Sequence, residues 1–116
     1  MTAARLSIEA SGATYVFSGH VHEQVLYFLT QTGKIALFHP TSGSAVPIPS
    51  HRRWQALAGS VGQPRDHNPA AAYALFDTTK EEMTFFRVAY DSMSAARKVR
   101  QAGLPETLAQ RLERGV

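Results

Sequence analysis

The chain has 116 residues, with 12 lysines and arginines against 9 aspartates and glutamates, no cysteine, and a formal net charge of +3 with the histidines neutral. This length predicts a single domain with a modest core, and the net charge is too mild to indicate nucleic-acid binding, which we do not expect. The absence of cysteine excludes disulfides and thiolate metal sites, and no apolar run approaches the roughly 20 residues that span a bilayer. We therefore expect a soluble, cytoplasmic protein without a membrane segment.

The first half of the chain predicts one helix followed by strands. Residues 2–11 favour a helix, with Thr2 as its N-cap and Gly12 at its end. "ATYVFSG" (13–19) is typical of a strand, and "QVLYFLTQTGKIALF" (24–38) predicts two strands around a turn. The stretch 39–51 is rich in Pro, Gly and Ser and is expected to be a loop, followed by a strand at "RRWQALA" (52–58).

The second half predicts a loop, a hairpin and two helices. "GSVGQPRDHNP" (59–69) is expected to be a loop, and "AAYALFD" (71–77) and "MTFFRVAY" (83–90) to pair across "TTKEE". "DSMSAARKVRQAG" (91–103) predicts a helix with Asp91 and Ser92 as candidate caps, and "LPETLAQRLERG" (104–115) predicts a second helix with a proline in its first turn.

Two histidines stand out in "YVFSGHVHEQ" (15–24), namely His20 and His22 behind Gly19. In extended backbone, residues i and i+2 point to the same side, about 6.5–7 Å apart. Two imidazoles so placed can hold one ion or reach two neighbouring ions. Histidines at a surface, or in ordinary hydrogen bonds, show the same spacing. The pattern alone leaves both interpretations open.

A second motif favours the interpretation of these histidines as metal ligands. "SGHVHEQ" (18–24) followed by "AGSVGQPRDHNPAAAYALFD" (58–77) resembles the C-terminal half of the calcineurin-like metallophosphoesterase superfamily. The resemblance is greatest to small bacterial and archaeal phosphodiesterases and diadenosine-tetraphosphatase-like members. It implies an α/β fold: the C-terminal half of a four-layer α/β/β/α sandwich, with mostly antiparallel strands and two C-terminal helices. Residues 1–116 then form a single partial domain.

The resemblance also implies a function and a site. The family hydrolyses phosphomonoesters or phosphodiesters with two divalent ions, which are Mn, Fe, Zn or Ni. By motif position His20 is similar to the ligand of the second metal and His22 to the ligand of the first. Gly59 and Gly62 are similar to glycines that let the loop turn beneath the site.

Two positions depart from the family pattern. Leu57 and Ala58 stand where the family has Asn-Pro, and His67 stands where the family has a turn glycine. Both changes are expected to loosen or reshape the loop. We expect side chains within the loop to hold its shape instead of contacting substrate: Ser60, Gln63 and Arg65.

The earlier family motifs, which are Asp-x-His, Gly-Asp and Gly-Asn-His, do not occur in these 116 residues. Two histidines are fewer than the three protein ligands of a typical catalytic zinc site. We therefore expect a fragment, a truncated product or a half that pairs with another chain, binding metal weakly or not at all and inactive alone. It is expected to be marginally stable or to dimerise. The alternative is a non-catalytic remnant that serves as an interaction or oligomerisation module.

The other histidines, Glu23 and the C-terminal basic residues are not expected to form part of a site. His39, His51 and His67 are interpreted as exposed loop residues, and Glu23 as an exposed residue at a strand start, although it also has the position to orient an imidazole. The basic residues near the C-terminus are interpreted as solvated helix faces and not as an anion-binding surface: Arg97, Lys98, Arg100, Arg111 and Arg114.

Overall fold

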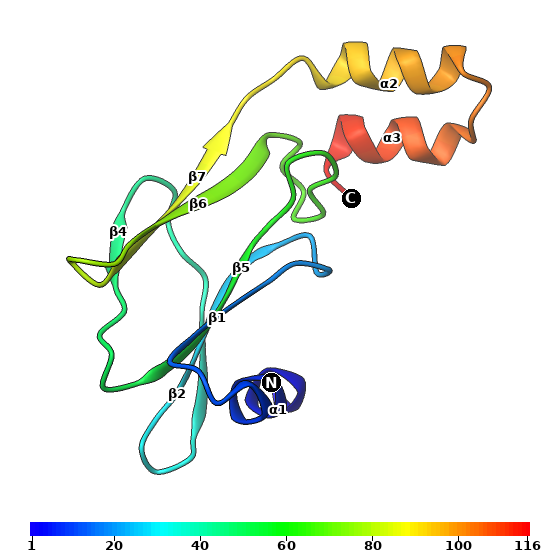
Figure 1. The fold of residues 1–116 in the computed structure, drawn as a ribbon. Helices are drawn as coiled ribbons and strands as arrows, with labels where there is room; N and C mark the ends of the chain where they lie inside the picture. Colours follow the sequence, from blue (N-terminus) through cyan, green and yellow to red (C-terminus); the bar gives the residue numbers. More distant parts are fainter.

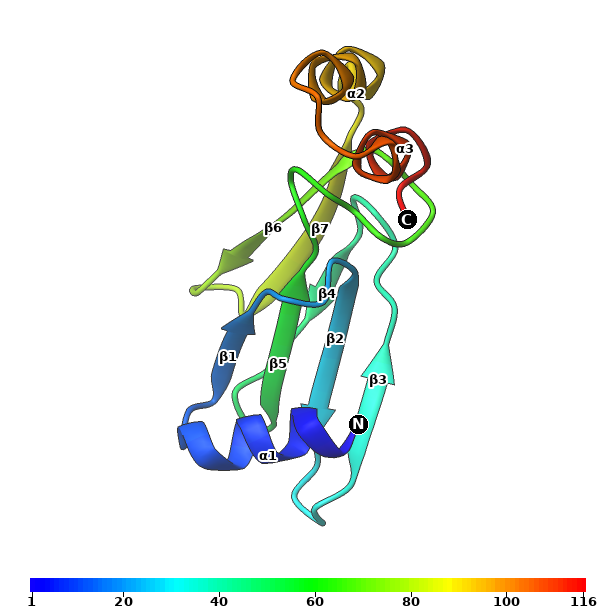
Figure 2. The same cartoon turned by 90° about the vertical axis from the view of Figure 1, so that its right-hand side faces the viewer.

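The computed structural model describes residues 1–116, which form two packed β-sheets and three helices (Figures 1 and 2). None of these helices has the length and apolar composition needed to cross a membrane. The elements in chain order are α1 (Thr2–Ser11), β1 (Tyr15–Ser18), β2 (Gln24–Leu29), β3 (Ile35–Phe38), β4 (Ala45–Pro47), β5 (Arg53–Ala58), β6 (Ala71–Asp77), β7 (Glu82–Val88), α2 (Ser92–Gln101) and α3 (Glu106–Arg114).

The first sheet has the strand order β1-β5-β2-β3. β1 runs parallel to β5, with Tyr15 opposite Trp54, whereas β2 runs antiparallel to both β5 and β3. α1 covers the outer face of this sheet, where Ala4 and Ile8 are buried. The predicted helix is confirmed, but its N-cap is Met1 and not Thr2, because Thr2 already lies within the helix.

The second sheet has the strand order β4-β7-β6, and all its pairs are antiparallel. The hairpin of β6 and β7 is confirmed. The expectation of a plain loop over 39–51 is wrong for residues 45–47, which pair with β7. A proline is tolerated there because β4 is an edge strand with only one neighbour. The next residue, Ile48, is 1% exposed and belongs to the core.

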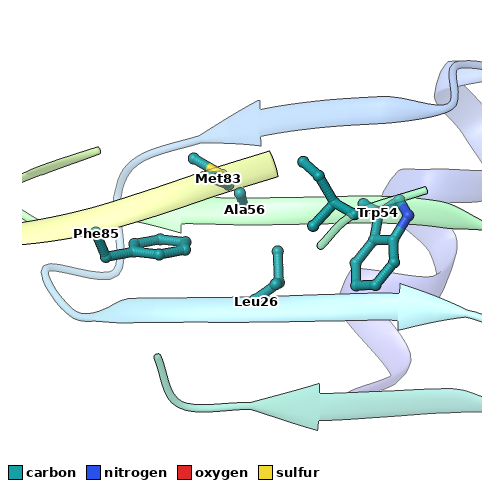
Figure 3. Packing of buried hydrophobic residues seen from close by; sticks show 6 residues of the cluster. Leu26, Trp54, Ala56, Met83 and Phe85 are labelled. Atoms are coloured by element: carbon teal, nitrogen blue, oxygen red, sulfur yellow. The ribbon is translucent and has the colours of Figure 1, made fainter. Parts of the chain in front are cut away.

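The core lies between the two sheets (Figure 3). Side chains alternate along each strand, so every second residue of β2, β5 and β7 points inward. Trp54 also donates from Nε1 to the carbonyl oxygen of Pro49 at 2.9 Å, so its buried polar atom has a partner. The cluster consists of Leu26, Ile48, Trp54, Ala56, Met83 and Phe85.

The two C-terminal helices form a hairpin that extends beyond the strand ends (Figure 1). Asp91 is the N-cap of α2, as predicted, and accepts from the Ser94 N–H at 3.0 Å. The Arg100 guanidinium contacts both Glu106 and Glu113, and these hydrogen bonds hold the pKa of each carboxyl below its usual range. α2 and α3 therefore contact each other more than they contact the sheets.

We predict that Gly59 is needed both for its backbone conformation and for its lack of a side chain. Its φ is +88°, and an added Cβ would lie 2.7 Å from the Ala72 Cβ, whereas Gly43 has a φ of +80° and open space around it. Gly43→Ala should cost about 1 kcal/mol through its backbone, and Gly59→Ala roughly 1–3 kcal/mol more through overpacking. Chemical denaturation of both variants measures this difference. Equal losses would show that the packing around Gly59 yields freely.

Candidate metal-binding site

Because of the strand order, residues 19–23, here called the histidine segment, lie against residues 59–70, here called the glycine loop. β1 and β2 lie on either side of β5, so the connection at residues 19–23 crosses the end of β5 (Figure 2). The loop 59–70 starts at that same end. Since β1 and β5 are parallel, both loops follow the carboxyl ends of neighbouring strands, where sites of α/β folds commonly form.

The histidine segment consists of two successive three-residue turns. The Val21 N–H donates to the Gly19 carbonyl at 2.9 Å around His20, and the Glu23 N–H donates to the Val21 carbonyl around His22. The φ of His20 is +72°, a left-handed conformation that few non-glycine residues adopt. The extended backbone assumed from the sequence is therefore wrong for residues 19–23, because the chain must turn here to reach β2.

His22 is held by the glycine loop at two points. Its Nδ1 lies 2.7 Å from the carbonyl oxygen of Gln63, and its own carbonyl accepts from the Arg65 N–H at 3.0 Å. A carbonyl oxygen only accepts hydrogen bonds, so Nδ1 of His22 must carry the proton. Nε2 of the neutral ring then keeps its lone pair for a ligand. A ring fixed in this way through its other nitrogen is common among histidines that bind metals.

His20 is exposed and lies two residues before His22 in the same segment. Imidazole suits Fe, Ni and Zn ions, so both side chains have the chemistry of metal ligands. No group of three or more His, Asp or Glu side chains in the chain is placed to hold a metal ion. The residues present therefore supply part of a donor set and not a complete centre.

The glycine loop is fixed by hydrogen bonds within itself. Ser60 Oγ accepts from the Gln63 N–H at 2.9 Å, and Arg65 Nη2 donates to Gln63 Oε1 at 2.9 Å. Pro64 is almost completely buried, which anchors the loop between these contacts. These bonds agree with a loop-shaping role for Ser60, Gln63 and Arg65. Leu57, at one of the positions that depart from the family pattern, is buried in β5.

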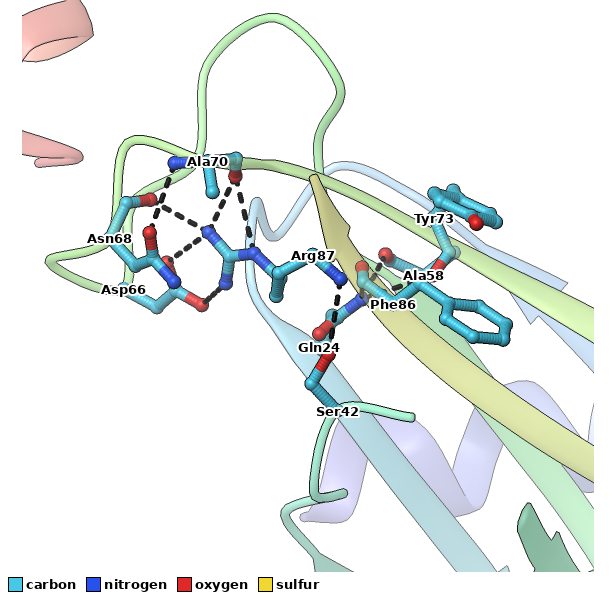
Figure 4. Close-up of polar contacts among 9 residues, drawn as sticks. All are labelled: Gln24, Ser42, Ala58, Asp66, Asn68, Ala70, Tyr73, Phe86 and Arg87. Carbon is cyan, nitrogen blue, oxygen red and sulfur yellow. Dashed lines mark hydrogen bonds and ion pairs between the residues drawn. The ribbon is translucent and has the colours of Figure 1, made fainter. Parts of the chain in front are cut away.

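The far end of the loop is held by Arg87 (Figure 4). Its guanidinium makes a two-pronged ion pair with Asp66, of which the Nη2–Oδ1 contact measures 3.0 Å, and Nη2 also donates to the carbonyl oxygens of Asn68 and Ala70 at 2.7 and 2.8 Å. His67 has a φ of +64°, which explains a glycine at this position in the family pattern. Its N–H donates to the Gly115 carbonyl, so the C-terminal end is tied to the same loop.

Gln24, directly after the histidine segment, joins the two sheets (Figure 4). Its Nε2 lies 3.3 Å from the Ala58 carbonyl of β5, and 3.2 and 3.0 Å from the carbonyls of Tyr73 in β6 and Phe86 in β7. One amide therefore connects the first sheet to the second at the strand ends next to His22. This contact fixes where the histidine segment meets β2.

Other residues singled out in the sequence lie apart from this arrangement. His39, His51 and His67 are exposed, as expected, whereas Glu23 is half-buried and not exposed. Arg97, Lys98, Arg111 and Arg114 are exposed on α2 and α3, and Arg100 pairs with glutamates of α3.

Sequence reasoning overlooked Gln24, Asp66 and Arg87. A signal for Arg87 was present, because the alternation in "MTFFRVAY" places it on the same face as the buried Met83 and Phe85. A cation on the inward face of a strand requires a partner. The carbonyl of Gln63 had no such signal, since a main-chain group leaves no mark in the sequence.

Comparison with known proteins supports the fold. The chain is 33% identical to a metallophosphoesterase from Sphaerobacter thermophilus, whose crystal structure matches 97% of this chain and 48% of its own with a TM-score of 0.81. It is also 31% identical, over 97 residues, to an uncharacterized protein of Methanocaldococcus jannaschii, covering 84% of this chain and 37% of that protein. No family model matches the chain. The chain thus has a metallophosphoesterase-like fold. It spans 48% of the solved protein and 37% of the Methanocaldococcus jannaschii protein.

Proposed function

We propose that the chain is the C-terminal half of a metal-dependent phosphoesterase, in which His20 and His22 are ligands of two divalent ions. The observation that carries this proposal is the hydrogen bond from His22 Nδ1 to the Gln63 carbonyl, because it leaves Nε2 as the free acceptor. It lies at the carboxyl ends of parallel strands β1 and β5. The similarity to a solved metallophosphoesterase supports the same assignment.

The backbone at His20 supports a functional role for that residue. A left-handed conformation of a non-glycine residue costs about 1–3 kcal/mol and is concentrated at functional sites. Nothing in the fold requires a histidine side chain there, since His20 is exposed and makes no side-chain hydrogen bond. Glycine would adopt the same turn without strain. The exposed His67 has a similar φ of +64° and no proposed ligand, so we base the inference that the His20 imidazole binds a ligand on its position beside His22 as well.

In the proposed enzyme, the residues of this chain bind and orient. Divalent ions, when bound, activate water and stabilise charge on phosphoryl oxygens. His22 presents Nε2 from a ring fixed by the Gln63 carbonyl, and His20 presents its ring from the neighbouring turn. Neither histidine needs to act as the nucleophile. The proposed substrate is a phosphomonoester or a phosphodiester, and the carboxylate ligands that would complete the site come from residues outside this chain.

The open side of the sandwich supports pairing with such residues. Phe17 of β1 packs its ring 5.4 Å from that of Phe76 of β6, so it faces the opposite sheet, yet 54% of Phe17 is exposed. β1 and β6 are both edge strands with unpaired backbone groups. We propose that the other half of the phosphoesterase covers this side. If the chain is instead an interaction or oligomerisation module, we expect a second copy of the chain to cover this side.

We predict that the isolated chain binds divalent ions weakly. Two imidazoles without a carboxylate provide too few ligands for a tight site. Isothermal calorimetry with Zn²⁺ and with Mn²⁺ should show at most loose binding to the wild type, and less to His22→Ala. Tight binding of two ions per chain that is abolished in His20→Ala would contradict the half-site.

We predict that the 116-residue chain does not hydrolyse p-nitrophenyl phosphate or bis-p-nitrophenyl phosphate with Mn²⁺ present. Joining it to an N-terminal half carrying Asp-x-His, Gly-Asp and Gly-Asn-His motifs should yield activity, measured by p-nitrophenol release. In the joined protein His22→Ala should lower kcat/KM by about two orders of magnitude or more, because it removes a ligand of one of the two ions that act together in the reaction.

The matched control is His51→Ala in the joined protein. His51 is exposed in the loop that precedes β5, at the opposite end of that strand from Ala58 and the glycine loop, so activity should be unchanged. Robust turnover by the short chain alone would show that other residues make the site. A joined protein that folds but stays inactive, while the short chain forms a dimer or binds a partner, would favour the interaction module.

A further inference from the structure

We propose that Arg87 is a positioning residue for His22, acting through the loop between Asp66 and Gln63. The proposal deepens the proposed function and rests on it for its importance, because it concerns the ring that is inferred to bind metal. The predicted coupling between the Arg87–Asp66 ion pair and the His22 ring is, however, a property of the chain without metal.

Arg87 has the environment of a dedicated clamp. Its side chain is 12% exposed and that of Asp66 is 27% exposed, so the pair is partly withdrawn from water. The guanidinium also donates to the carbonyls of Asn68 and Ala70. One side chain of β7 therefore binds three residues of the loop, Asp66, Asn68 and Ala70 (Figure 4). The planar fork of arginine makes such simultaneous contacts, whereas a lysine ammonium acts as a point charge.

The clamp lies close in sequence to the contacts of His22. Asp66 directly follows Arg65, whose N–H donates to the His22 carbonyl at 3.0 Å. Gln63, whose carbonyl accepts from His22 Nδ1, is two residues before Arg65, with the buried Pro64 between them. Residues 63–66 thus form a short, anchored segment. Its C-terminal end is set by Arg87, and two of its other contacts, those of the Gln63 carbonyl and the Arg65 N–H, reach His22.

A clamp that only stabilised the fold would make a different prediction. In that case its loss would lower the melting temperature and leave the proton on His22 Nδ1. If Arg87 positions the Gln63 carbonyl, its loss frees the ring to place the proton on either nitrogen. The tautomer of His22 therefore separates a positioning role from a purely structural role.

The test is a long-range ¹H–¹⁵N NMR spectrum of the imidazoles in the 116-residue chain without metal, at about pH 8, where histidine is mostly neutral. In the wild type His22 should be the Nδ1–H tautomer, while exposed His51 shows the ordinary mixture. In Arg87→Ala, and in the isosteric Asp66→Asn, the His22 signals should shift toward those of His51. Arg87→Lys should give an intermediate shift.

The control is a core variant, Ile48→Val, which should lower the melting temperature without touching the loop and should leave the His22 tautomer unchanged. Arg5→Ala, which removes an exposed arginine–glutamate pair of α1, should have no effect on it. If His22 keeps its Nδ1 proton in both Arg87→Ala and Asp66→Asn, the proposal is wrong. If Arg87→Ala does not fold, Asp66→Asn alone decides. An inactive joined enzyme would refute the proposed function and leave this result standing.

Discussion

The structure depends on one crossing, the passage of the β1–β2 connection over the end of β5. β5 lies between the two strands that this connection joins, so residues 19–23 must meet the loop that leaves β5. The crossing is closed by the contacts of His22 with Gln63 and Arg65 and by the amide of Gln24 across both sheets. The histidines are therefore placed by strand order and not by their local sequence.

Much of this arrangement was readable from the sequence, because the apolar pattern and the turn residues agree. β1, β2, β3, β5, β6 and β7 follow β-branched and aromatic runs bounded by glycine, proline or polar turns. Asp91 and Gly12 mark helix ends through their ordinary chemistry, as a side-chain acceptor and a left-handed residue. His20 and His22 were identified by their spacing and their place after a strand.

The remaining features depend on contacts between distant residues. β4 was missed because a three-residue edge strand that ends in a proline has a loop-like composition, and its pairing with β7 is decided by the rest of the sheet. Gln24 and Arg87 act through main-chain carbonyls brought close only by folding. The turns at His20 and His22 were missed because the sequence does not state that β2 lies two strands away from β1.

The central claim is that the ring of His22 presents Nε2 to a metal ion while Nδ1 stays bound to the Gln63 carbonyl. Anomalous X-ray diffraction from crystals of the joined protein with Mn²⁺ tests this most directly. We expect one anomalous peak next to His22 Nε2, a second next to the His20 ring, and an intact Nδ1–Gln63 contact. Peaks that lie away from both histidines, or a His22 ring turned from Gln63 to bind through Nδ1, would contradict it.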